Sequence, residues 1–513
     1  MKKVYKVTVT WIGAMICLGL TLLSAVYDCY MSDVWSSFHE ITIFEKDHIW
    51  INLLALLFFV GVFWALAKRF SNVRISEISY EVIHYMLLAV IAAMGVFWVL
   101  NVKAVPREDQ LFIQQSLEEF LNGDKAPFMP DGYIGIYPHQ TGYMWFSLIV
   151  AKIFGLYNYT ALQLINVAAL VLFYESLTRL CDLFQFKKHV GIMILVAGIL
   201  FYPLIIYTSF VYGNLLGLAF ATASIWRAFC VDSDRSRPVL NYILSAVLMA
   251  LAVQCKKNYL IFAIGLIIWL FVKASADKKK QTFIALAGIV LAVTLGMRLP
   301  IALTEWRTGC KLDSGIPATA FIAMGLQESE RAPGWYNEYT KDLAFSTEHD
   351  HKVQVQIAKQ DIKESLNRFK SDPKYAFVFF LNKTKSQWSN PTFQSVWVNQ
   401  FVGDTETQPK WVQSFLSFDN VMIHVRYLSI LTFIIFFGAL LYIPLSVRED
   451  RYTESLILLM IVIGGFIFHT FWEGKSEYTI SYFVLLIPYC CAGFVRLAER
   501  LGKIYEQQGT ENT

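Results

Sequence analysis

Two adjacent carboxylates, Glu108 and Asp109, follow a long apolar run and open a segment of helical character. Two interpretations of this pair are open. Acids in the first turn of a helix are stabilised by the positive end of the helix dipole and need no further role. A carboxylate beside a membrane can also act as a general base toward a hydroxyl group. The choice depends on which other polar side chains lie on the same side of the membrane.

A second group of residues that could do chemistry lies at turns between apolar runs. Lys256 and Lys257 interrupt an apolar hairpin, where a cationic pair is favoured either by an anionic ligand or by lipid headgroups. Fixed cations can stabilise the charge that develops on a leaving phosphate. Each remaining candidate also has a structural interpretation, as part of a turn, a helix start or a solvated cluster: Tyr137, His139, Tyr212, Asn214, Glu473, Lys475, Glu477 and Tyr478.

The chain that must position these residues is strongly apolar. Of its 513 residues, 56% are hydrophobic and only 16% are charged, whereas a soluble chain carries about a quarter charged residues. Apolar runs of roughly 20 residues, the length that crosses a bilayer, recur along the chain. They predict an all-α polytopic membrane protein with about 12 transmembrane helices, at residues 5–27, 48–67, 82–103, 159–178, 188–208, 212–230, 239–255, 258–274, 281–301, 426–446, 453–471 and 479–498.

Lysines and arginines collect on one side of this arrangement. By the positive-inside rule, clusters such as the lysine-rich run at 276–281 lie in the cytoplasm. Both termini are then expected in the cytoplasm, and the long loops 104–158 and 302–425 on the extracellular side. The chain divides into an additional N-terminal hairpin, a central transmembrane module, a small helical extracellular subdomain or lid, and C-terminal helices with a cytoplasmic tail, at residues 1–81, 82–301, 302–425 and 426–513.

The first long outer loop is expected to hold two juxtamembrane helices, at 108–122 and 139–155. In the first, apolar residues recur at helical spacing while glutamines and glutamates cover the other face. The second is apolar but short for a span and carries Lys152. Counting it as a span would place Arg179 outside, against the positive-inside rule, so we lay it along the membrane surface.

Acids, cations and aromatic residues thus gather on one membrane face. This inventory suits a substrate with a lipid tail and a phosphate at the interface. Gly-rich phosphate loops and the HExxH and GxSxG motifs are lacking in the sequence, so nucleotide-driven and protease chemistry are poorly supported. The 8 cysteines show no metal-like spacing and are interpreted as structural. We expect no nucleic-acid partner. The sequence identifies no cofactor, and it does not decide whether a divalent metal takes part.

The order of these features resembles the C-type (GT-C) membrane glycosyltransferases, which include the protein O-mannosyltransferases and the aminoarabinose transferases of lipid A. In that family a span leads to an acidic pair that opens a juxtamembrane helix, and a proline-containing turn precedes a second such helix ending in Phe-Gly. The corresponding stretches here are EDQLFIQQSLEEFLNGD, YPHQTGYMWFSLIVAKIFG and YTALQLINVAALVLFYESLTRL. The resemblance covers residues 82–300 well and 453–498 loosely. The family's usual Asp-Glu order is reversed here, and Pro138-His139-Gln140 replaces its His-Pro-Pro turn.

By what the resemblance implies, residues 82–301 form the catalytic module. The donor would be a sugar on polyprenyl phosphate, drawn from among the membrane lipids, and the acceptor a hydroxyl of an extracellular glycopolymer, lipid or protein. Asp109, with Glu108 beside it, would deprotonate that hydroxyl, and Lys256 and Lys257 would hold the donor phosphate. The residues left to contact sugar or acceptor are Tyr137, His139, Tyr212, Asn214, Glu473, Lys475 and Tyr478.

Two other functions stay open at this point. A flippase or exporter of lipid-linked sugars or polysaccharide would carry charged residues near the middle of the bilayer and often shows repeats, whereas here the charges lie at span ends. A polysaccharide polymerase or ligase would be favoured by an outer loop rich in arginine, and the stretch 104–138 contains only Arg107.

Overall fold

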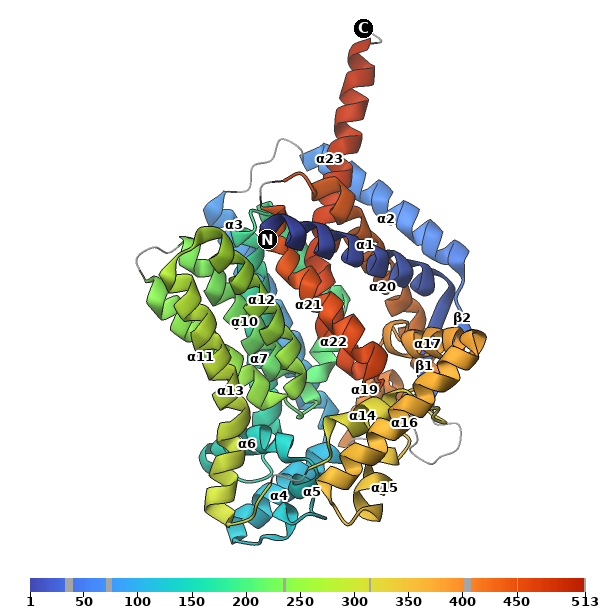
Figure 1. Cartoon of the computed structure of the whole chain (residues 1–513). Helices are drawn as coiled ribbons and strands as arrows, with labels where there is room; N and C mark the ends of the chain where they lie inside the picture. Colours follow the sequence, from blue (N-terminus) through green and yellow to red (C-terminus); the bar gives the residue numbers. More distant parts are fainter. Residues whose placement is uncertain are drawn as a thin grey trace.

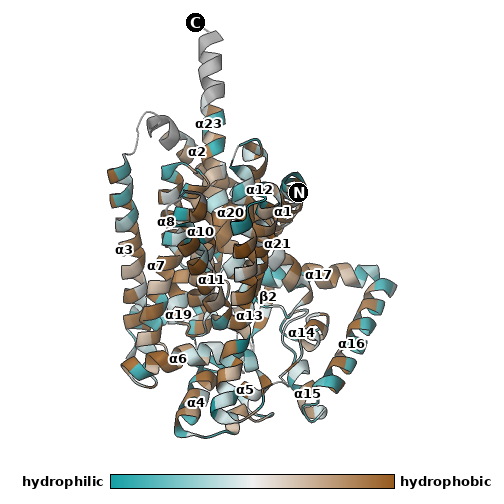
Figure 2. Cartoon of the chain, turned by 60° about the vertical axis from the view of Figure 1, so that its left-hand side comes forward, coloured by the Kyte–Doolittle hydropathy of each residue, from teal (hydrophilic) through white to brown (hydrophobic). Residues whose placement is uncertain are grey.

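The computed structural model describes residues 1–32, 40–70, 76–233, 237–312, 315–400, 407–449 and 451–511. In these ranges ten helical segments are long and apolar enough to cross a membrane. Figure 1 shows them as a bundle, and Figure 2 shows apolar residues along most of its length. The segments are α1 (Lys2–Val26), α3 (Glu77–Val102), α7 (Tyr159–Leu183), α10 (Asn214–Ser233), α11 (Pro238–Cys255), η4 with α12 (Lys257–Tyr259 and Leu260–Asp277), α13 (Lys280–Thr308), α20 (Val421–Ser446), α21 (Tyr452–Phe471) and the run from α22 (Ser476–Phe483) through η7 (Val484–Leu486) into α23 (Ile487–Glu511).

The two remaining predicted spans also form helices. α8 (Lys188–Leu200) continues, after a bend of 60°, into α9 (Pro203–Ile206) and η3 (Tyr207–Ser209). α2 (Ile49–Phe70) contains a shorter apolar stretch, Ile49–Ala65. The fold class predicted from the sequence, an all-α polytopic membrane protein, is therefore confirmed.

One element departs from that prediction. The loop between the first two helices forms a β-hairpin, with β1 (Tyr27–Ser32) antiparallel to β2 (Ile41–Lys46) and Tyr27 opposite Lys46. The β-branched residues of β2 suit a half-buried strand. A hairpin needs only local pairing, and its two strands are too short to show in the apolar periodicity of a membrane protein.

The long connection between α3 and α7 contains the two helices expected there. α4 (Asp109–Asn122) and α6 (Thr141–Phe154) are joined by η1 (Ala126–Phe128), α5 (Tyr133–Ile136) and η2 (Pro138–Gln140). The apolar faces of α4 and α6 meet in one cluster, in which Ile113 and Leu117 pack with Tyr143 and Met144. The helical spacing of the apolar residues thus reports the packed face of α4.

The segment after α13 is helical in the described ranges. Its helices are α14 (Ala318–Gly325), α15 (Tyr339–Ser346), α16 (His351–Ser371), α17 (Pro373–Trp388), α18 (Trp397–Gln400), α19 (Lys410–Leu416) and η6 (Phe418–Asn420). Proline at the N-terminus of α17, with Asp372 accepting a hydrogen bond from the Tyr375 N–H, separates it sharply from α16. Figures 1 and 2 show α14, α15 and α16 toward the same end of the molecule as α4 and α5. We call this end the site end.

The two N-terminal helices belong to the bundle. α1 packs mainly on α20 and α21, and α2 packs mainly on α23. The N-terminus of α1 and the C-terminus of α23 both lie toward the end of the bundle opposite the site end (Figure 1). The β-hairpin follows the C-terminus of α1, so it lies closer to the site end than the N-terminus does (Figure 1).

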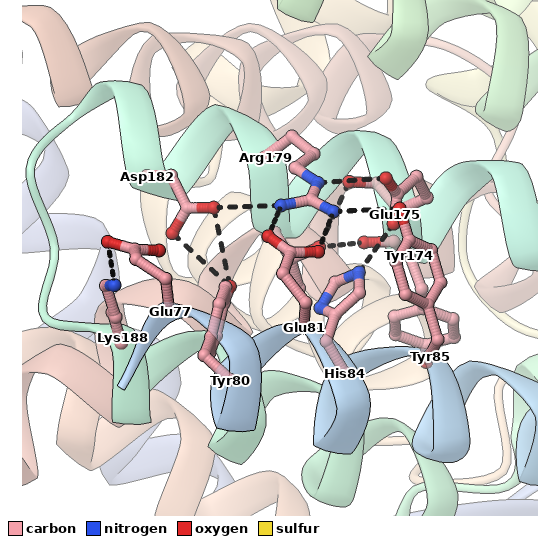
Figure 3. A network of polar contacts seen from close by, with 11 residues as sticks. Glu77, Tyr80, Glu81, His84, Tyr85, Tyr174, Glu175, Arg179, Asp182 and Lys188 are labelled. Atoms are coloured by element: carbon pink, nitrogen blue, oxygen red, sulfur yellow. Dashed lines mark hydrogen bonds and ion pairs between the residues drawn. The ribbon is translucent and has the colours of Figure 1, made fainter. Parts of the chain in front are cut away.

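A network around Arg179 joins α3 to α7 (Figure 3). Its guanidinium forms two hydrogen bonds of 2.7 Å with Glu81 of α3 and one of 2.9 Å with Glu175 one turn earlier on α7. His84, fully buried, contacts the other oxygen of Glu175 at 2.5 Å. Two-pronged pairing of arginine with a carboxylate is among the stronger polar contacts in proteins, so this network fixes the position of α3, which leads to Asp109.

Replacing Arg179 tests this network. In Arg179→Ala the carboxylates of Glu81 and Glu175 lose their shared cation, and we expect a loss of about 1–3 kcal/mol of stability, measured as a lower unfolding temperature in detergent. Arg179→Lys keeps the charge but cannot bind both carboxylates. Its unfolding temperature should lie between those of Arg179→Ala and the unaltered protein. Equal stability of Arg179→Ala and the unaltered protein would contradict a structural role for the network.

Candidate active site

Asp109 begins α4 and is exposed, as is Glu108 before it. One oxygen of Asp109 accepts a hydrogen bond of 3.0 Å from the hydroxyl of Tyr212. Glu108 has φ 48° and ψ −129°, a conformation that costs an ordinary residue about 1–3 kcal/mol. The residue after Asp109, Gln110, is buried and accepts a hydrogen bond of 2.9 Å from the N–H of Val211. The turn before α4 is thus held by its neighbours, with Asp109 directed at Tyr212.

The turn that carries Tyr212 is pressed against the turn between α11 and α12. Gly213 has φ 80°, and a Cβ atom there would lie 2.4 Å from the carbonyl oxygen of Cys255. Only glycine allows this approach. The contact places the Tyr212 ring 4.6 Å from the ammonium of Lys256, while the Tyr212 hydroxyl receives a hydrogen bond of 2.6 Å from Gln140.

Lys256 is the centre of the cluster. Its ammonium donates to Asn214 at 2.7 Å and to Glu477 at 2.9 Å, and it lies 5.1 Å from the ring of Tyr478. Burial lowers the pKa of Lys256, and the charge of Glu477 opposes this shift. Six residues singled out in the sequence are therefore brought together here: Asp109, Tyr212, Asn214, Lys256, Glu477 and Tyr478.

Lys257 has different surroundings from Lys256. It is exposed, and the positive charge of Arg298 on α13 acts on it unfavourably. Within the residues that the structure describes, neither Lys257 nor Arg298 forms an ion pair. Arg298 did not stand out in the sequence because it lies inside the run 281–301, which is otherwise apolar.

A row of rings lies beside Asp109. Tyr137 packs against Tyr133 at 5.3 Å and meets His139 edge-on at 6.0 Å. Burial, followed by the charge of Asp109, raises the pKa of Tyr137. Burial and the charges of Lys257 and Lys256 lower the pKa of His139 to about 3. His139 is therefore neutral at physiological pH and can offer hydrogen bonds but no positive charge.

The turn between α21 and α22 contributes Glu473 and Lys475. Lys475 binds Glu40 at 2.8 Å and lies 3.5 Å from Glu477. Burial opposes the charge of Lys475, but Glu40 and Glu477 outweigh it and raise its pKa. Burial raises the pKa of Glu473 to about 7, although Lys475 and Arg331 oppose the shift; Glu40 and Asp109 reinforce it.

Two contributors to this cluster come from parts of the chain that the sequence did not connect with it. Glu40 lies just before β2, within residues 1–81, which the sequence predicts as an additional transmembrane hairpin, and its other oxygen binds Arg331 at 2.8 Å. Lys383, from α17, is buried and donates to the carbonyl oxygens of Gly325 and Trp472. Of these residues, only Lys383 could have been noticed in the sequence, because it is a lysine in a helix rich in aromatic residues. Neither Glu40 nor Arg331 differs from the residues around it in a way that marks a site.

In the described ranges, no group of three or more His, Cys, Asp or Glu residues is placed to hold a metal ion. The acids of the site alternate with cations instead, as in the series Glu40, Lys475, Glu477 and Lys256.

Comparisons with known proteins find little similarity in sequence. A scan against models of protein families gives no match, and neither does a search of curated proteins. Among solved structures, the fold is similar to that of the archaeal oligosaccharyltransferase AglB from Archaeoglobus fulgidus, in complex with an inhibitory peptide and a dolichol-phosphate. The TM-score is 0.42 at 12% identity, over 84% of this chain and 51% of that one.

A second structure is of an Archaeoglobus fulgidus oligosaccharyltransferase tethered to an acceptor peptide. It gives a TM-score of 0.39 at 13% identity, over 80% of this chain and 49% of that one. The chain thus spans about half the length of the proteins it matches. With TM-scores below 0.5, neither match assigns a function to this chain.

The surroundings of Glu473 predict a pH-dependent stability. Its pKa is about 7 in the folded protein, against an ordinary value of 4.5. The folded protein therefore holds a proton between these values that the unfolded chain releases, and stability falls as the pH rises through this window. Glu473→Gln imitates the protonated acid. We expect it to gain about 1–3 kcal/mol relative to the unaltered protein between pH 5 and pH 8, measured from unfolding temperatures in detergent.

The control for this measurement is Glu330→Gln, which removes an exposed acid of the segment between α13 and α20. Its stability relative to the unaltered protein should not change with pH. A stability difference for Glu473→Gln that is constant between pH 5 and pH 8 would show that Glu473 is ionised throughout.

Proposed function

We propose that the protein is an integral-membrane glycosyltransferase of the GT-C type, which moves a sugar from a polyprenyl-phosphate donor to a hydroxyl of an extracytoplasmic acceptor. The observation that carries this proposal is the exposed carboxylate of Asp109, held by Tyr212 beside the partly buried ammonium of Lys256. An accessible acid next to fixed cations at the ends of membrane spans suits chemistry between a hydroxyl group and a lipid-linked phosphate. The acceptor is a cell-envelope glycopolymer, a lipid or a protein.

In the reaction, the acceptor hydroxyl gives its proton to Asp109 and its oxygen attacks the anomeric carbon of the sugar. The bond between that carbon and the phosphate oxygen breaks, and polyprenyl phosphate leaves with the electron pair. A phosphate needs little protonation to leave, so Asp109 requires no obligatory acid partner. Tyr212 orients Asp109 through their hydrogen bond of 3.0 Å, and Glu108 sets the backbone turn that precedes it.

The two neighbouring lysines have separate roles. Lys256 is bound by Glu477 and Asn214 and serves to order the site. Lys257 and Arg298 repel each other and form no ion pair in the described part of the chain. A phosphate between them would relieve this repulsion. We therefore assign the donor phosphate to Lys257 and Arg298, a change from the equal roles that the sequence suggests for Lys256 and Lys257.

Aromatic and polar groups around Asp109 would receive the sugar and the acceptor. Tyr137 and Tyr478 present apolar ring faces with a polar end, and neutral His139 offers hydrogen bonds. Glu473, whose pKa of about 7 lets it carry a proton near neutral pH, is suited to donate a hydrogen bond to a sugar hydroxyl. Lys475 stays charged and holds Glu477 in place.

The proposal includes an orientation. The site end, with the juxtamembrane helices α4 and α6 and the helices of the outer segment, lies outside the cell membrane, and both termini lie in the cytoplasm. The lysine and arginine content of the opposite flanks supports this orientation.

Replacing the proposed base gives the decisive test. Purified Asp109→Asn should transfer sugar from polyprenyl-phosphate donors to envelope glycopolymer about 10²–10⁴-fold more slowly than the unaltered protein, with donor binding and unfolding temperature retained. The matched control is Asp131→Asn, which changes an exposed acid of the same loop and should keep full activity.

Glu108→Gln distinguishes between the two adjacent acids. A loss smaller than that of Asp109→Asn is expected, because Glu108 acts through the backbone turn. If Asp109→Asn is as active as the unaltered protein, Asp109 is only the start of a helix. If the unaltered protein transfers no sugar from any such donor, the proposed function is wrong.

The roles of the cations predict a division of kinetic effects. Lys257→Ala and Arg298→Ala should each raise the KM for the donor about tenfold, the effect of losing one charged hydrogen bond, with a smaller change in kcat. Lys152→Ala, which removes an exposed cation of α6, is the control and should change neither value. An unchanged donor KM in both variants would exclude this pair as the phosphate site.

A further inference from the structure

The β-hairpin between the first two helices is fixed at both strands to the segment between α13 and α20. The N–H of Cys29 in β1 donates to the carbonyl oxygen of Ser389 at 2.9 Å, and the N–H of Thr42 in β2 donates to that of Arg331 at 3.0 Å. Met31 packs in a buried cluster with tryptophans of that segment. The hairpin therefore has a defined position relative to the residues around Arg331.

Glu40 uses this position to join two cations. One carboxylate oxygen lies 2.8 Å from the ammonium of Lys475, and the other lies 2.8 Å from the guanidinium of Arg331. The Glu40 side chain is only 14% exposed, and its partners are 21% and 22% exposed. Ion pairs shielded to this degree are stronger than pairs at a fully solvated surface.

Contacts continue from Glu40 to the proposed base. Lys475 lies 3.5 Å from one oxygen of Glu477, whose other oxygen binds Lys256 at 2.9 Å. The ammonium of Lys256 lies 4.6 Å from the Tyr212 ring, and Tyr212 donates to Asp109. Each member thus has partners on both sides, so a change at Glu40 has a continuous route to Asp109.

We propose that Glu40 is a positioning residue of the transferase site, so that the β-hairpin of β1 and β2 completes the site. This inference rests on the proposed function. Glu40 holds Lys475 and Arg331 on separate oxygens and shares the charge of Lys475 with Glu477. Without that carboxylate, Lys475 would be left with Glu473 and Glu477 and would draw Glu477 away from Lys256.

This role predicts a particular kinetic effect. The chain of contacts from Glu40 ends at the base, whereas the proposed phosphate site at Lys257 and Arg298 lies outside it. Glu40→Gln should therefore lower kcat about tenfold, because small displacements of a catalytic group cost one to two orders of magnitude in rate. The KM for the donor should change less than threefold. A hairpin that only holds the fold together would lower the amount of folded protein and leave the kcat of the folded fraction unchanged.

The experiment measures kcat, donor KM and unfolding temperature for the full-length protein in detergent with polyprenyl-phosphate sugar donors. Glu40→Asp keeps the charge and should recover part of the kcat lost in Glu40→Gln. Glu45→Gln, which changes an exposed acid of the same hairpin, should behave as the unaltered protein. In Glu40→Gln combined with Lys475→Gln, kcat should be no lower than in Lys475→Gln alone, because Glu40 acts through Lys475.

The outcomes separate this inference from the proposed function. An inactive unaltered protein contradicts the function. If the unaltered protein is active and Glu40→Gln has the same kcat, only the role of Glu40 is contradicted. The same conclusion follows if the kcat of the double variant is lower than that of Lys475→Gln by the factor that Glu40→Gln loses alone. If Glu40→Gln does not fold, Glu40→Asp alone decides: its shorter side chain should lower kcat severalfold at unchanged donor KM, and an unaltered kcat overturns the inference.

Discussion

The ion pair between Lys256 and Glu477 is the contact on which the arrangement of the site depends. The Lys256 side chain is largely shielded from water, and removing one member of a shielded ion pair leaves the other charge without compensation. Glu477 is only 3% exposed, and Asn214 binds both side chains. The contact therefore ties the start of α10, the turn before α12 and the start of α22 to one point. Tyr212, packed on the same ammonium, carries this order to Asp109.

Much of the fold could be predicted from local patterns. Apolar runs long enough to cross a bilayer define the spans, because each backbone group within the membrane must be paired inside its own helix. Helical spacing of apolar residues and the acidic start of EDQLFIQQ define α4. Charged residues at span ends are costly and therefore informative, which is why Lys256, Glu477 and Asp109 stood out before their contacts were known.

The rest depends on contacts between residues that are far apart in the chain. Arg331 and Glu40 are 291 residues apart, and nothing local to either marks them as partners. The position of the hairpin of β1 and β2 could not be predicted for the same reason, since it is set by backbone hydrogen bonds to Ser389 and Arg331. Arg298 was hidden by the apolar run around it, because a single charge barely changes the average character of a long span.

The cations of the site divide into two kinds, and the division explains how one surface can be both ordered and able to bind. Lys256 and Lys475 are each held by carboxylates, so their charges are balanced and their positions fixed before any substrate arrives. Such preorganised groups stabilise developing charge without rearranging during the reaction. Lys257 and Arg298 repel each other, so an anion that binds between them gains from the relief of that repulsion. Cations that are all paired with carboxylates would bind a phosphate poorly. Unpaired cations alone could not hold Asp109 and Tyr212 in fixed positions. The site needs both, and the separation of Lys256 from Lys257 by a single peptide bond is how this chain provides them side by side.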